Sequence, residues 1–572
     1  MLSIHLIGTP RIVVDGEERR LRGRKAWALL ARVALSDRPL SRRLLAAEVF
    51  PDAEDPLGAL RWSLAELRRT LVAPQSLHGD PVQLNLPDDA AVDALALTAS
   101  PSAVDLTGVG GRLLEGADAA VSAEYDSWLL VEQQRVAARV HAAIREASLR
   151  ALAVGDVQRA VALAQRAAAG DPLDEGAQVL LVRALIASGD HDAAQRHVAA
   201  CETLFASELG AAPSAALRSA ARSRPDAPPM GVNPRAAAVS QLSAGKAALD
   251  AGAADAGIEC LRRAVAEAES TGDTALQGEA LLALGTALVH AVRGFDDEGA
   301  VTLHQAAAMA RASGDQRTCA EALKELGYVD ALAGRRPQAQ ALLVEAAELA
   351  ADDDAMLAGV LAVQGLNLSD WHQLDEASRR FAESIELSRR AQKPRQTAWS
   401  LGVLGRTELL RGELGDARAV LDECLSLVEQ EHWTAFRPWP SAFLGDVELA
   451  EKQDPKEIGS RMEVQFALSC QLADPCWEGV TGRVVGLSLA AAGHSDQALE
   501  WLSEARRRSF RATDRFAWVC GYILLAEAGA AERSGDADHA AAAALTLRDL
   551  SVRADLPGLL QPAQELTARL GV

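Results

Sequence analysis

The stretch Asp55-Pro56-Leu57-Gly58-Ala59-Leu60-Arg61-Trp62-Ser63-Leu64-Ala65-Glu66-Leu67-Arg68-Arg69-Thr70-Leu71 decides how the first hundred residues fold. A helix is predicted to begin at its start, because an Asp side chain accepts hydrogen bonds from free backbone N–H groups and a Pro suits the first helical turn. Leucines spaced three and four residues apart predict one buried face, formed by Leu57, Leu60, Leu64, Leu67 and Leu71. The opposite face carries Trp62, Glu66 and Arg69 and is therefore open to a partner.

The segments on either side of this helix predict a small domain of strands and helices. Upstream, extended runs predict strands at 3–7, 11–14 and 17–21, with a hairpin turn at Asp15-Gly16. Helical patterns follow over residues 24–36 and from the cap Ser41 to Val49. Downstream, residues 81–86 and 91–97 are predicted as two strands of a closing hairpin. Together these elements predict an α/β winged helix-turn-helix domain over residues 1–98.

Basic residues gather around the three predicted helices. Residues 1–72 hold 13 Lys and Arg against 9 Asp and Glu, a net charge of +4, whereas the other 500 residues hold 45 against 70, a net of −25. Arginines near helix N-termini are frequent phosphate ligands, so one interpretation is DNA binding; the other is an ordinary solvated helix face. The DNA-binding interpretation assigns roles to Arg24, Lys25, Arg42, Arg43, Arg61, Trp62, Ser63, Arg68 and Arg69.

Ordered motifs in this region resemble a known protein family. Leu6-Ile7-Gly8-Thr9-Pro10, Leu21-Arg22-Gly23-Arg24-Lys25 and residues 59–69 resemble the DNA-binding half of the bacterial antibiotic-regulatory activators, which share an OmpR/PhoB-like winged helix. Residues 105–225, with Gly111-Arg112-Leu113-Leu114-Glu115-Gly116, are similar to their helical bacterial transcriptional activator domain. The resemblance implies Trp62, Ser63 and Arg69 in the major groove. It also implies promoter DNA, RNA polymerase and a homodimer as partners.

The third predicted helix departs from the family pattern at one place. Members often have Ser-Arg where this chain has Ala65-Glu66, so a carboxylate replaces a phosphate or guanine contact. Glu66 could accept a hydrogen bond from a cytosine amino group or pair with Arg69 on its own helix, and we favour the pairing. Modest DNA affinity is therefore expected.

The acidic remainder predicts a helical repeat array. Gly155-Asp156 and Gly189-Asp190 lie 34 residues apart, and Ala160 and Ala194 follow each pair at the same distance, which is the tetratricopeptide period. Prolines then mark a linker over residues 226–236. Beyond it, turn positions recur every 38 to 42 residues at Gly252, Gly294, Gly334, His372, Gly412, Lys452, Gly493 and Gly535. Residues 237–572 are therefore predicted to form a solenoid of about eight tetratricopeptide-like repeats.

Small residues occupy fixed places beside these turns. Seven residues before the turn stand Gly245, Ala287, Gly327, Gly365, Gly405, Gly445, Gly486 and Ala528. Five residues after it the pattern again places Gly or Ala, except at Glu457. The repeat around Lys452 also carries an aromatic segment, residues 432–440. Its side chains are either core between repeats or the rim of an effector groove, formed by Trp433, Phe436, Arg437 and Trp439.

The functional prediction is a cytoplasmic transcriptional regulator, an activator by family resemblance, whose repeat array senses a protein or small molecule. The alternative is a protein-interaction scaffold whose degenerate winged helix does not bind DNA. No nucleophile–base set, phosphate-binding loop or metal-ligand spacing is legible, so no enzyme activity, cofactor or metal is expected. No run of about 18 apolar residues predicts a membrane segment. The seven cysteines are scattered and are expected to be reduced thiols.

Overall fold

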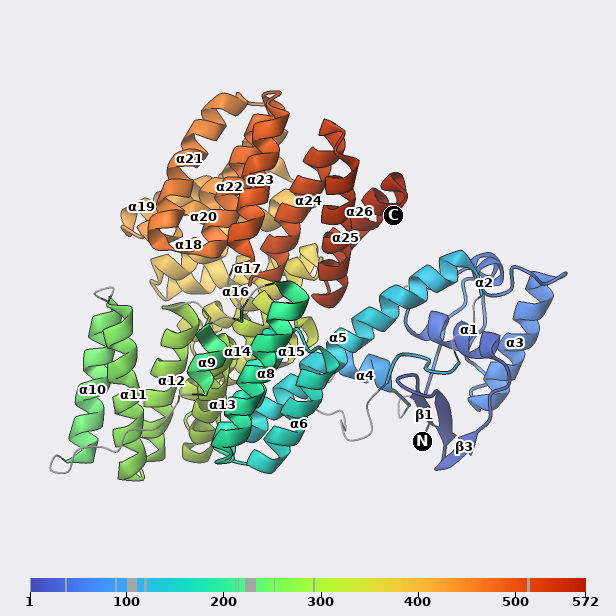
Figure 1. Cartoon of the computed structure of the whole chain (residues 1–572), viewed down its shortest axis with the longest axis horizontal. Helices are drawn as coiled ribbons and strands as arrows, with labels where there is room; N and C mark the ends of the chain where they lie inside the picture. Colours follow the sequence, from blue (N-terminus) through green and yellow to red (C-terminus); the bar gives the residue numbers. More distant parts are fainter. Residues whose placement is uncertain are drawn as a thin grey trace. The chain divides into compact units, whose positions relative to one another are not determined.

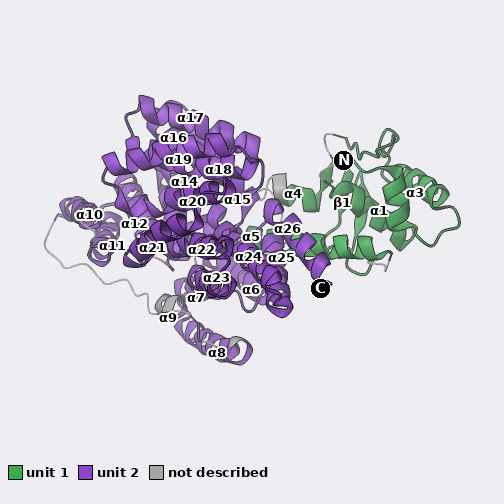
Figure 2. Ribbon diagram, turned by 90° about the horizontal axis from the view of Figure 1, so that it is seen from above, with its two compact units in different colours: residues 1–144 green, residues 145–572 purple. Residues whose placement is uncertain are grey.

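The computed structural model describes residues 2–36, 39–87, 90–99, 111–117, 121–210, 212–213, 215–221, 233–250, 253–291, 294–511 and 515–572. Helices dominate these residues, and strands occur near the N-terminus (Figure 1). The chain divides into two compact units, Met1–Ile144 and Arg145–Val572 (Figure 2). The predicted fold class is confirmed: mainly α, with a small mixed sheet and helices at the N-terminus followed by many paired helices.

The first unit contains a four-stranded mixed sheet in the order β3-β2-β1-β4. Its strands are β1 (Leu2–His5), β2 (Arg11–Val14), β3 (Glu17–Arg19) and β4 (Ala91–Val92). The β2–β3 hairpin turns at Asp15 and Gly16, whose φ angles are 51° and 85°, as the Asp-Gly pair predicts. β4 pairs in parallel with β1, whereas the other pairs are antiparallel.

Three helices of this unit follow the predicted pattern: α1 (Arg24–Ala34), α2 (Arg42–Val49) and α3 (Pro56–Thr70). The Ser41 side chain accepts a hydrogen bond from the Leu44 N–H, and Asp55 accepts one from Gly58 at 2.8 Å, so both predicted caps are confirmed. Leu60, Leu64 and Leu67 of α3 are buried.

The predicted closing hairpin is wrong. Residues 81–86 form no strand and make isolated bridges, Leu40 with Val82 and His78 with Gln83. Residues 91–97 contribute two residues to β4 and then become helix α4 (Asp93–Ala99). The Asp93 carboxylate accepts hydrogen bonds from the Leu6, Ile7 and Ala94 N–H groups, which ends the strand and starts the helix. The following Ala-Leu-Ala-Leu run favours a helix once it has begun, and this overrides its two-residue alternation.

The motif at residues 111–116 pairs with the chain directly after β1. Ile7 bridges Leu113 in antiparallel fashion, and Leu114 N–H donates to the Leu6 carbonyl at 2.8 Å. The long helix α5 (Ala123–Ala153) follows, and its buried Tyr125 hydroxyl donates to the Ala28 carbonyl of α1. The start of α5 is therefore part of the first unit's core.

The second unit is a succession of antiparallel helix pairs (Figure 1). Its first helices are α6 (Val157–Gly170), α7 (Glu175–Ala187), α8 (His191–Leu209) and α9 (Ala215–Ala220). The pairs beyond residue 233 are α10 (Pro234–Asp250) with α11 (Ala254–Thr271), α12 (Thr274–His290) with α13 (Asp296–Ser313), α14 (Gln316–Ala333) with α15 (Arg336–Leu349), α16 (Asp354–Asp370) with α17 (Leu374–Arg390), α18 (Pro394–Arg411) with α19 (Leu414–Gln430), α20 (Pro438–Ala450) with α21 (Pro455–Leu472), α22 (Pro475–Ala491) with α23 (Ser495–Ser509) and α24 (Ala517–Ser534) with α25 (Ala537–Arg553). A 3-10 turn η2 (Thr434–Phe436) precedes α20, and α26 (Pro557–Leu570) closes the chain.

The predicted turn register holds in every described repeat. Each of its turn residues adopts a left-handed backbone, with φ between 61° and 89°, at Gly294, Gly334, His372, Gly412, Lys452, Gly493 and Gly535. Gly155 and Gly189 do the same in the earlier pairs, where Asp156 and Asp190 cap the next helix. Gly252 and most of the predicted linker, residues 226–236, lie outside the described residues.

The glycines seven residues before the turns let the two helices of a pair come close together. A Cβ placed on Gly405 would lie 2.4 Å from Leu421 Cγ, well inside van der Waals contact. An added Cβ would likewise lie inside van der Waals contact of the side chain sixteen residues later in the sequence at four other glycines, Gly245, Gly327, Gly365 and Gly486. Gly445, in the repeat with the aromatic segment, meets Val484 instead. The small residue five positions after the turn is fully buried at Ala339, Ala377, Ala417, Ala498 and Ala540, and Glu457 is exposed.

The early helices share a core with the array that follows them. One hydrophobic cluster runs from Leu149 of α5 through Val182 of α7 to Val360 of α16. Polar contacts reinforce it, because the Arg145 guanidinium pairs with Asp297 of α13 and the Glu146 carboxylate lies 3.2 Å from His304. The end of α5 is thus fastened to α13 by two adjacent side chains.

Candidate nucleic-acid interface and effector groove

The outer face of α3 is exposed in the first unit. Trp62 is 64% exposed, a large value for a side chain of this size and apolarity. Two predicted positions are exchanged: Leu57 is 48% exposed, whereas Ser63 is buried at 8%. Ser63 faces the interior because it precedes Leu64 and lies one turn after Leu60, on the edge of the buried stripe. The exposed face is therefore formed by Trp62 and its arginine neighbours, without Ser63.

The predicted basic residues differ in their exposure and in whether the fold holds their side chains. Arg24 and Arg43 are exposed, at the starts of α1 and α2. Arg69 is exposed and donates from Nε to the Ala65 carbonyl of its own helix at 3.3 Å. Arg61 lies 3.6 Å from the Asp55 carboxylate, and both side chains are 68% exposed. These four guanidinium groups can reach an anion without leaving a buried position.

The other three predicted basic residues are held by the fold. Arg68 donates to the Leu77 carbonyl at 3.1 Å, and Arg42 donates from Nε to the Gly79 carbonyl at 2.8 Å. The Lys25 ammonium lies 5.7 Å from the centre of the Phe50 ring. The favoured Glu66–Arg69 ion pair does not form among the described residues, because Arg69 turns toward Ala65. Glu66 thus places a carboxylate that makes no ion pair among the described residues beside the exposed face.

The second unit contains a groove of about 490 Å³ lined by helices α12, α14, α16, α18 and α22 and by η2. Trp399, Trp433, Phe436 and Trp477 supply its aromatic wall. Trp433 and Phe436 stack with ring centroids 4.6 Å apart, and Trp477 meets Phe436 edge-on at 6.1 Å.

The four aromatic-segment residues predicted for an effector groove are divided by the structure. Trp433 and Phe436 line the groove. Trp439 is 2% exposed and donates its indole N–H to the Gly402 carbonyl at 3.0 Å, so it is core between repeats. Arg437 is exposed and does not line the groove. Trp399 and Arg395, which belong to the preceding repeat, do line it. Their presence in the groove could not be predicted from the sequence, because the stacking of one repeat on the next brings them to the aromatic segment.

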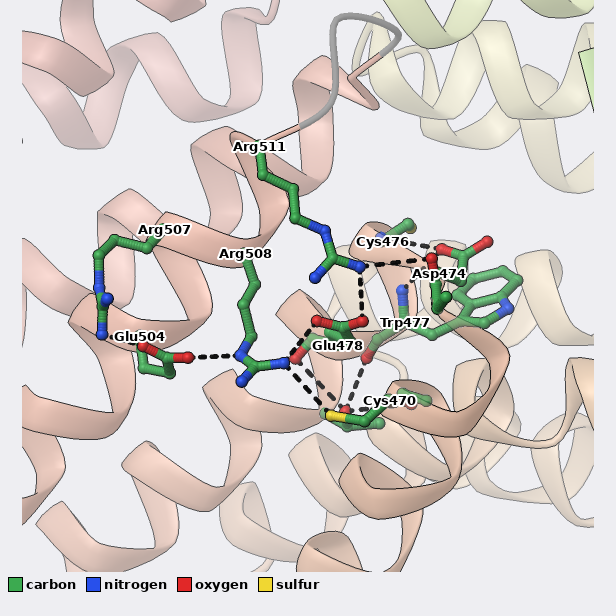
Figure 3. A network of polar contacts seen from close by, with 12 residues as sticks. Cys470, Asp474, Cys476, Trp477, Glu478, Glu504, Arg507, Arg508 and Arg511 are labelled. Carbon is green, nitrogen blue, oxygen red and sulfur yellow. Dashed lines mark hydrogen bonds and ion pairs between the residues drawn. The ribbon is translucent and has the colours of Figure 1, made fainter. Parts of the chain in front are cut away.

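A polar network fixes the Trp477 wall (Figure 3). Asp474 caps α22 by accepting hydrogen bonds from the Cys476 and Trp477 N–H groups. One turn on, the buried Glu478 carboxylate pairs with Arg508 at 2.8 Å and Arg511 at 2.7 Å (Figure 3). The start of α22 is therefore fixed by the Asp474 cap and by the ion pairs of Glu478, and these contacts fix the position of Trp477 in the groove wall.

The opposite wall of the groove carries a buried charge cluster. Glu325 is 4% exposed and lies 2.8 Å from the Lys324 ammonium and 2.7 Å from His290 Nε2. Burial by itself would raise the pKa of the Glu325 carboxyl, but the charges and hydrogen bonds of Lys324 and His290 lower it below its usual range. Lys324 is thereby neutralised by its neighbour, and its charge is not free for a ligand.

The two units define a class of protein: a small sheet-and-helix domain with an exposed basic helix, followed by tetratricopeptide-like helical repeats. More particularly, residues 91–223 match the model of the bacterial transcriptional activator domain. The chain therefore contains a domain of the kind found in bacterial transcriptional activators, as the resemblance at residues 105–225 implied. No curated protein matches the chain.

Several solved structures are similar at low identity. The Mycobacterium tuberculosis protein EmbR, solved in complex with a low-affinity phosphopeptide, is 16% identical with a TM-score of 0.31; the match covers 38% of this chain and 64% of EmbR. Aspartyl phosphate phosphatase F from Bacillus subtilis is 11% identical over 71% of this chain and 92% of its own, with a TM-score of 0.38. Yeast Tom70 is 13% identical over 78% and 91%, with a TM-score of 0.31. Similarity this low carries no functional inference. Within the described residues, no helix is long and apolar enough to cross a membrane.

Proposed function

We propose that this protein is a DNA-binding transcriptional regulator, an activator, that contacts promoter DNA through α3 and responds to an effector through its repeat array. The observation that carries the proposal is the exposed face of α3, where Trp62 stands between Arg61 and Arg69 in a chain that also contains an activator domain. Covering the exposed Trp62 ring with a partner would remove apolar surface from water and so favour binding at this face.

The interface consists of two kinds of contact. Trp62 and Arg69 would enter the major groove, where an arginine can bind a guanine edge and an indole can pack on a thymine methyl group. Arg24, Arg43 and Arg61 would bind phosphates. Backbone N–H groups at the start of α1, which has no side-chain cap, would add to the attraction, whereas at the start of α2 the Arg42 and Leu44 N–H groups already donate to Asp80 and Ser41. Ser63 has no direct role in the proposed interface, because its side chain is buried.

The activator domain and the repeat array supply the other parts of the proposal. By family resemblance, the domain would support a homodimer on repeated half-sites and contact RNA polymerase. The array would pass its state to α5 through Arg145 and Glu146, since both side chains grip α13. We propose the same domain limits that the sequence predicts: 1–98 for the winged helix, 105–225 for the activator domain and 237–572 for the repeat array.

Salt-dependent gel shift with DNA from upstream of the protein's own gene tests it. Three phosphate-binding guanidinium groups correspond to a slope of about −2.7 in log Kobs against log salt, so affinity should fall about 40-fold between 50 and 200 mM salt. The double variant Arg24→Ala, Arg43→Ala should flatten the slope by about 1.8. Arg19→Ala, on the edge strand β3 beside Glu17, is the matched control and should leave the slope unchanged.

The same experiment decides against the competing function. A scaffold whose helical domain docks on protein would show no shift at 50 mM salt, and the acidic neighbours Asp55 and Glu66 are the features that favour that alternative. A shift of equal strength in the double variant would also refute the proposed interface.

A further inference from the structure

The groove in the second unit continues beyond its aromatic wall. A second hollow of about 400 Å³ shares Lys324, Gly359, Arg395 and Gln396 with the first, so the two form one groove. Gly359 lies at their junction, where a Cβ would find its nearest neighbours at 3.6 and 3.7 Å. The combined space has the size of a pocket for a small organic molecule.

One half of the groove is suited to flat rings. Trp399, Trp433 and Trp477 are each half-buried, so their ring surfaces are partly in water although their positions are fixed by packing. Indole faces exposed in this way favour an aromatic guest, which stacks on them and removes apolar surface from water.

The other half offers unpaired positive charge. Arg395 is exposed and makes no ion pair among the described residues; its guanidinium lies 5.8 Å from the Trp433 ring centre and donates to the Glu431 carbonyl oxygen. Neighbouring arginines of the same repeats behave differently, because Arg390 pairs with Asp354 and Arg418 with Glu451.

Four basic and two acidic residues line this half, and two of the four basic groups are already paired. Lys324 pairs with Glu325, and Arg317 lies 3.9 Å from Asp353, so Lys393 and Arg395 remain, beside Glu321 and Glu431. Lys393 is exposed, like Arg395, and directly precedes the start of α18. Two exposed cations that make no ion pair among the described residues, beside an aromatic wall, are complementary to a molecule that carries both an anionic group and a planar ring.

We infer that the groove binds a small planar aromatic molecule bearing a carboxylate or similar anionic group. The ring stacks against Trp433, Trp399 and Trp477, and the anion pairs with Arg395 and Lys393. The role of this ligand as an effector rests on the proposed regulatory function, but the binding itself involves the second unit alone.

The test uses the full-length protein and two fluorescent probes that differ mainly in charge. The anionic probe is 1-anilinonaphthalene-8-sulfonate, and the neutral probe is N-phenyl-1-naphthylamine. The wild-type chain should bind one molecule of the anionic probe per chain with saturation. Arg395→Met should weaken that binding at least fivefold and leave the neutral probe within twofold, because only the ion pair is lost.

Two further variants complete the design. Arg437→Met removes the same charge from an exposed site outside the groove and should change neither titration. Trp433→Ala should weaken both probes, and circular dichroism checks that it remains folded. Since Arg395 is exposed, Arg395→Met is expected to fold even if Trp433→Ala does not.

Three outcomes would overturn the inference: no saturable binding of the anionic probe, equal weakening of both probes by Arg395→Met, or equal effects of the Arg395 and Arg437 variants. Gel shift on the same samples without probe keeps the two proposals apart. A protein that binds DNA but not the probe overturns the groove inference alone, and one that binds the probe but no DNA overturns the DNA-binding proposal alone.

Discussion

The glycine at the crossing of each helix pair provides a quantitative test of the repeat packing. In Gly405→Ala, the new methyl carbon would lie 2.4 Å from Leu421 Cγ and 2.5 Å from Cδ2. Ordinary contacts are about 3.5–4.0 Å, so Leu421 or helix α19 must move by roughly 1 Å. Leu421 is fully buried, so its side chain can move only by displacing packed neighbours.

The net effect can be worked out from two opposing contributions. Overpacking of a well-packed core costs about 1–3 kcal/mol, whereas Ala in place of Gly in a helix gains about 0.5–1 kcal/mol. The difference spans about 0–2.5 kcal/mol, and we expect a net destabilisation of about 1–2 kcal/mol because the 2.4 Å approach to Leu421 is close even for an overpacked site. Gly415→Ala is the matched control in the same repeat: nothing lies within 4 Å of its added methyl group, so it should be neutral or stabilising.

Hydrogen exchange followed by mass spectrometry measures the effect where it occurs, which matters because a chain with two units need not unfold in one step. Peptides from α18 and α19 should exchange about 5–30 times faster in Gly405→Ala, and no faster in Gly415→Ala. Unchanged or slower exchange in Gly405→Ala would refute the steric explanation of the glycine period.

Three other predictions address charge and accessibility. Glu66→Gln should raise DNA affinity severalfold, measured by gel shift at fixed salt, because it removes a carboxylate beside Trp62; unchanged affinity would place Glu66 outside the interface. Burial would raise the pKa of the Asp297 carboxyl, but its salt bridge with Arg145 lowers that pKa below its usual range. The salt bridge therefore contributes its full stabilisation above the pKa of an unfolded Asp, near 4, and this stabilisation is lost as the pH falls further. In the variant Arg145→Met, α13 should therefore unfold at a higher pH than in the wild-type chain when the protein is acidified. Hydrogen exchange of α13 measures the pH midpoint of this unfolding, and an unshifted midpoint would contradict the prediction. Finally, a thiol reagent at pH 8 should modify the half-buried cysteines before the buried ones, whose pKa is raised by burial, to about 12 at Cys424 and Cys520; modification of those two without denaturant would be inconsistent with the fold.

Much of the architecture was predictable from local signals that act within one or two turns of chain. The left-handed turn residues recur at one phase because every pair must reverse direction at the same point, and even His372 and Lys452, which are not glycines, take that conformation. Likewise, Ser41 and Asp55 cap their helices as predicted, since a cap depends on residues three positions away.

The failures arose where distant contacts decide the structure. Asp93 accepts hydrogen bonds from the Leu6 and Ile7 N–H groups directly after β1, 87 and 86 residues earlier, and this contact turns a predicted strand into a helix. The groove wall combines Trp399 with Trp433 and Trp477 from successive repeats, so its composition follows from stacking of helices and not from any one segment. Trp439 was grouped with them by proximity in sequence, but its indole N–H faces the core.

Mapping the DNA bound by the full-length protein in cells tests the central claim most directly. We expect discrete sites near promoters for the wild-type chain, and their loss in the Trp62→Ala, Arg69→Ala variant at equal protein abundance. Arg19→Ala should retain them. Absence of enriched sites for the wild-type protein, or the same sites in the α3 variant, would contradict the claim that the exposed face of α3 binds DNA.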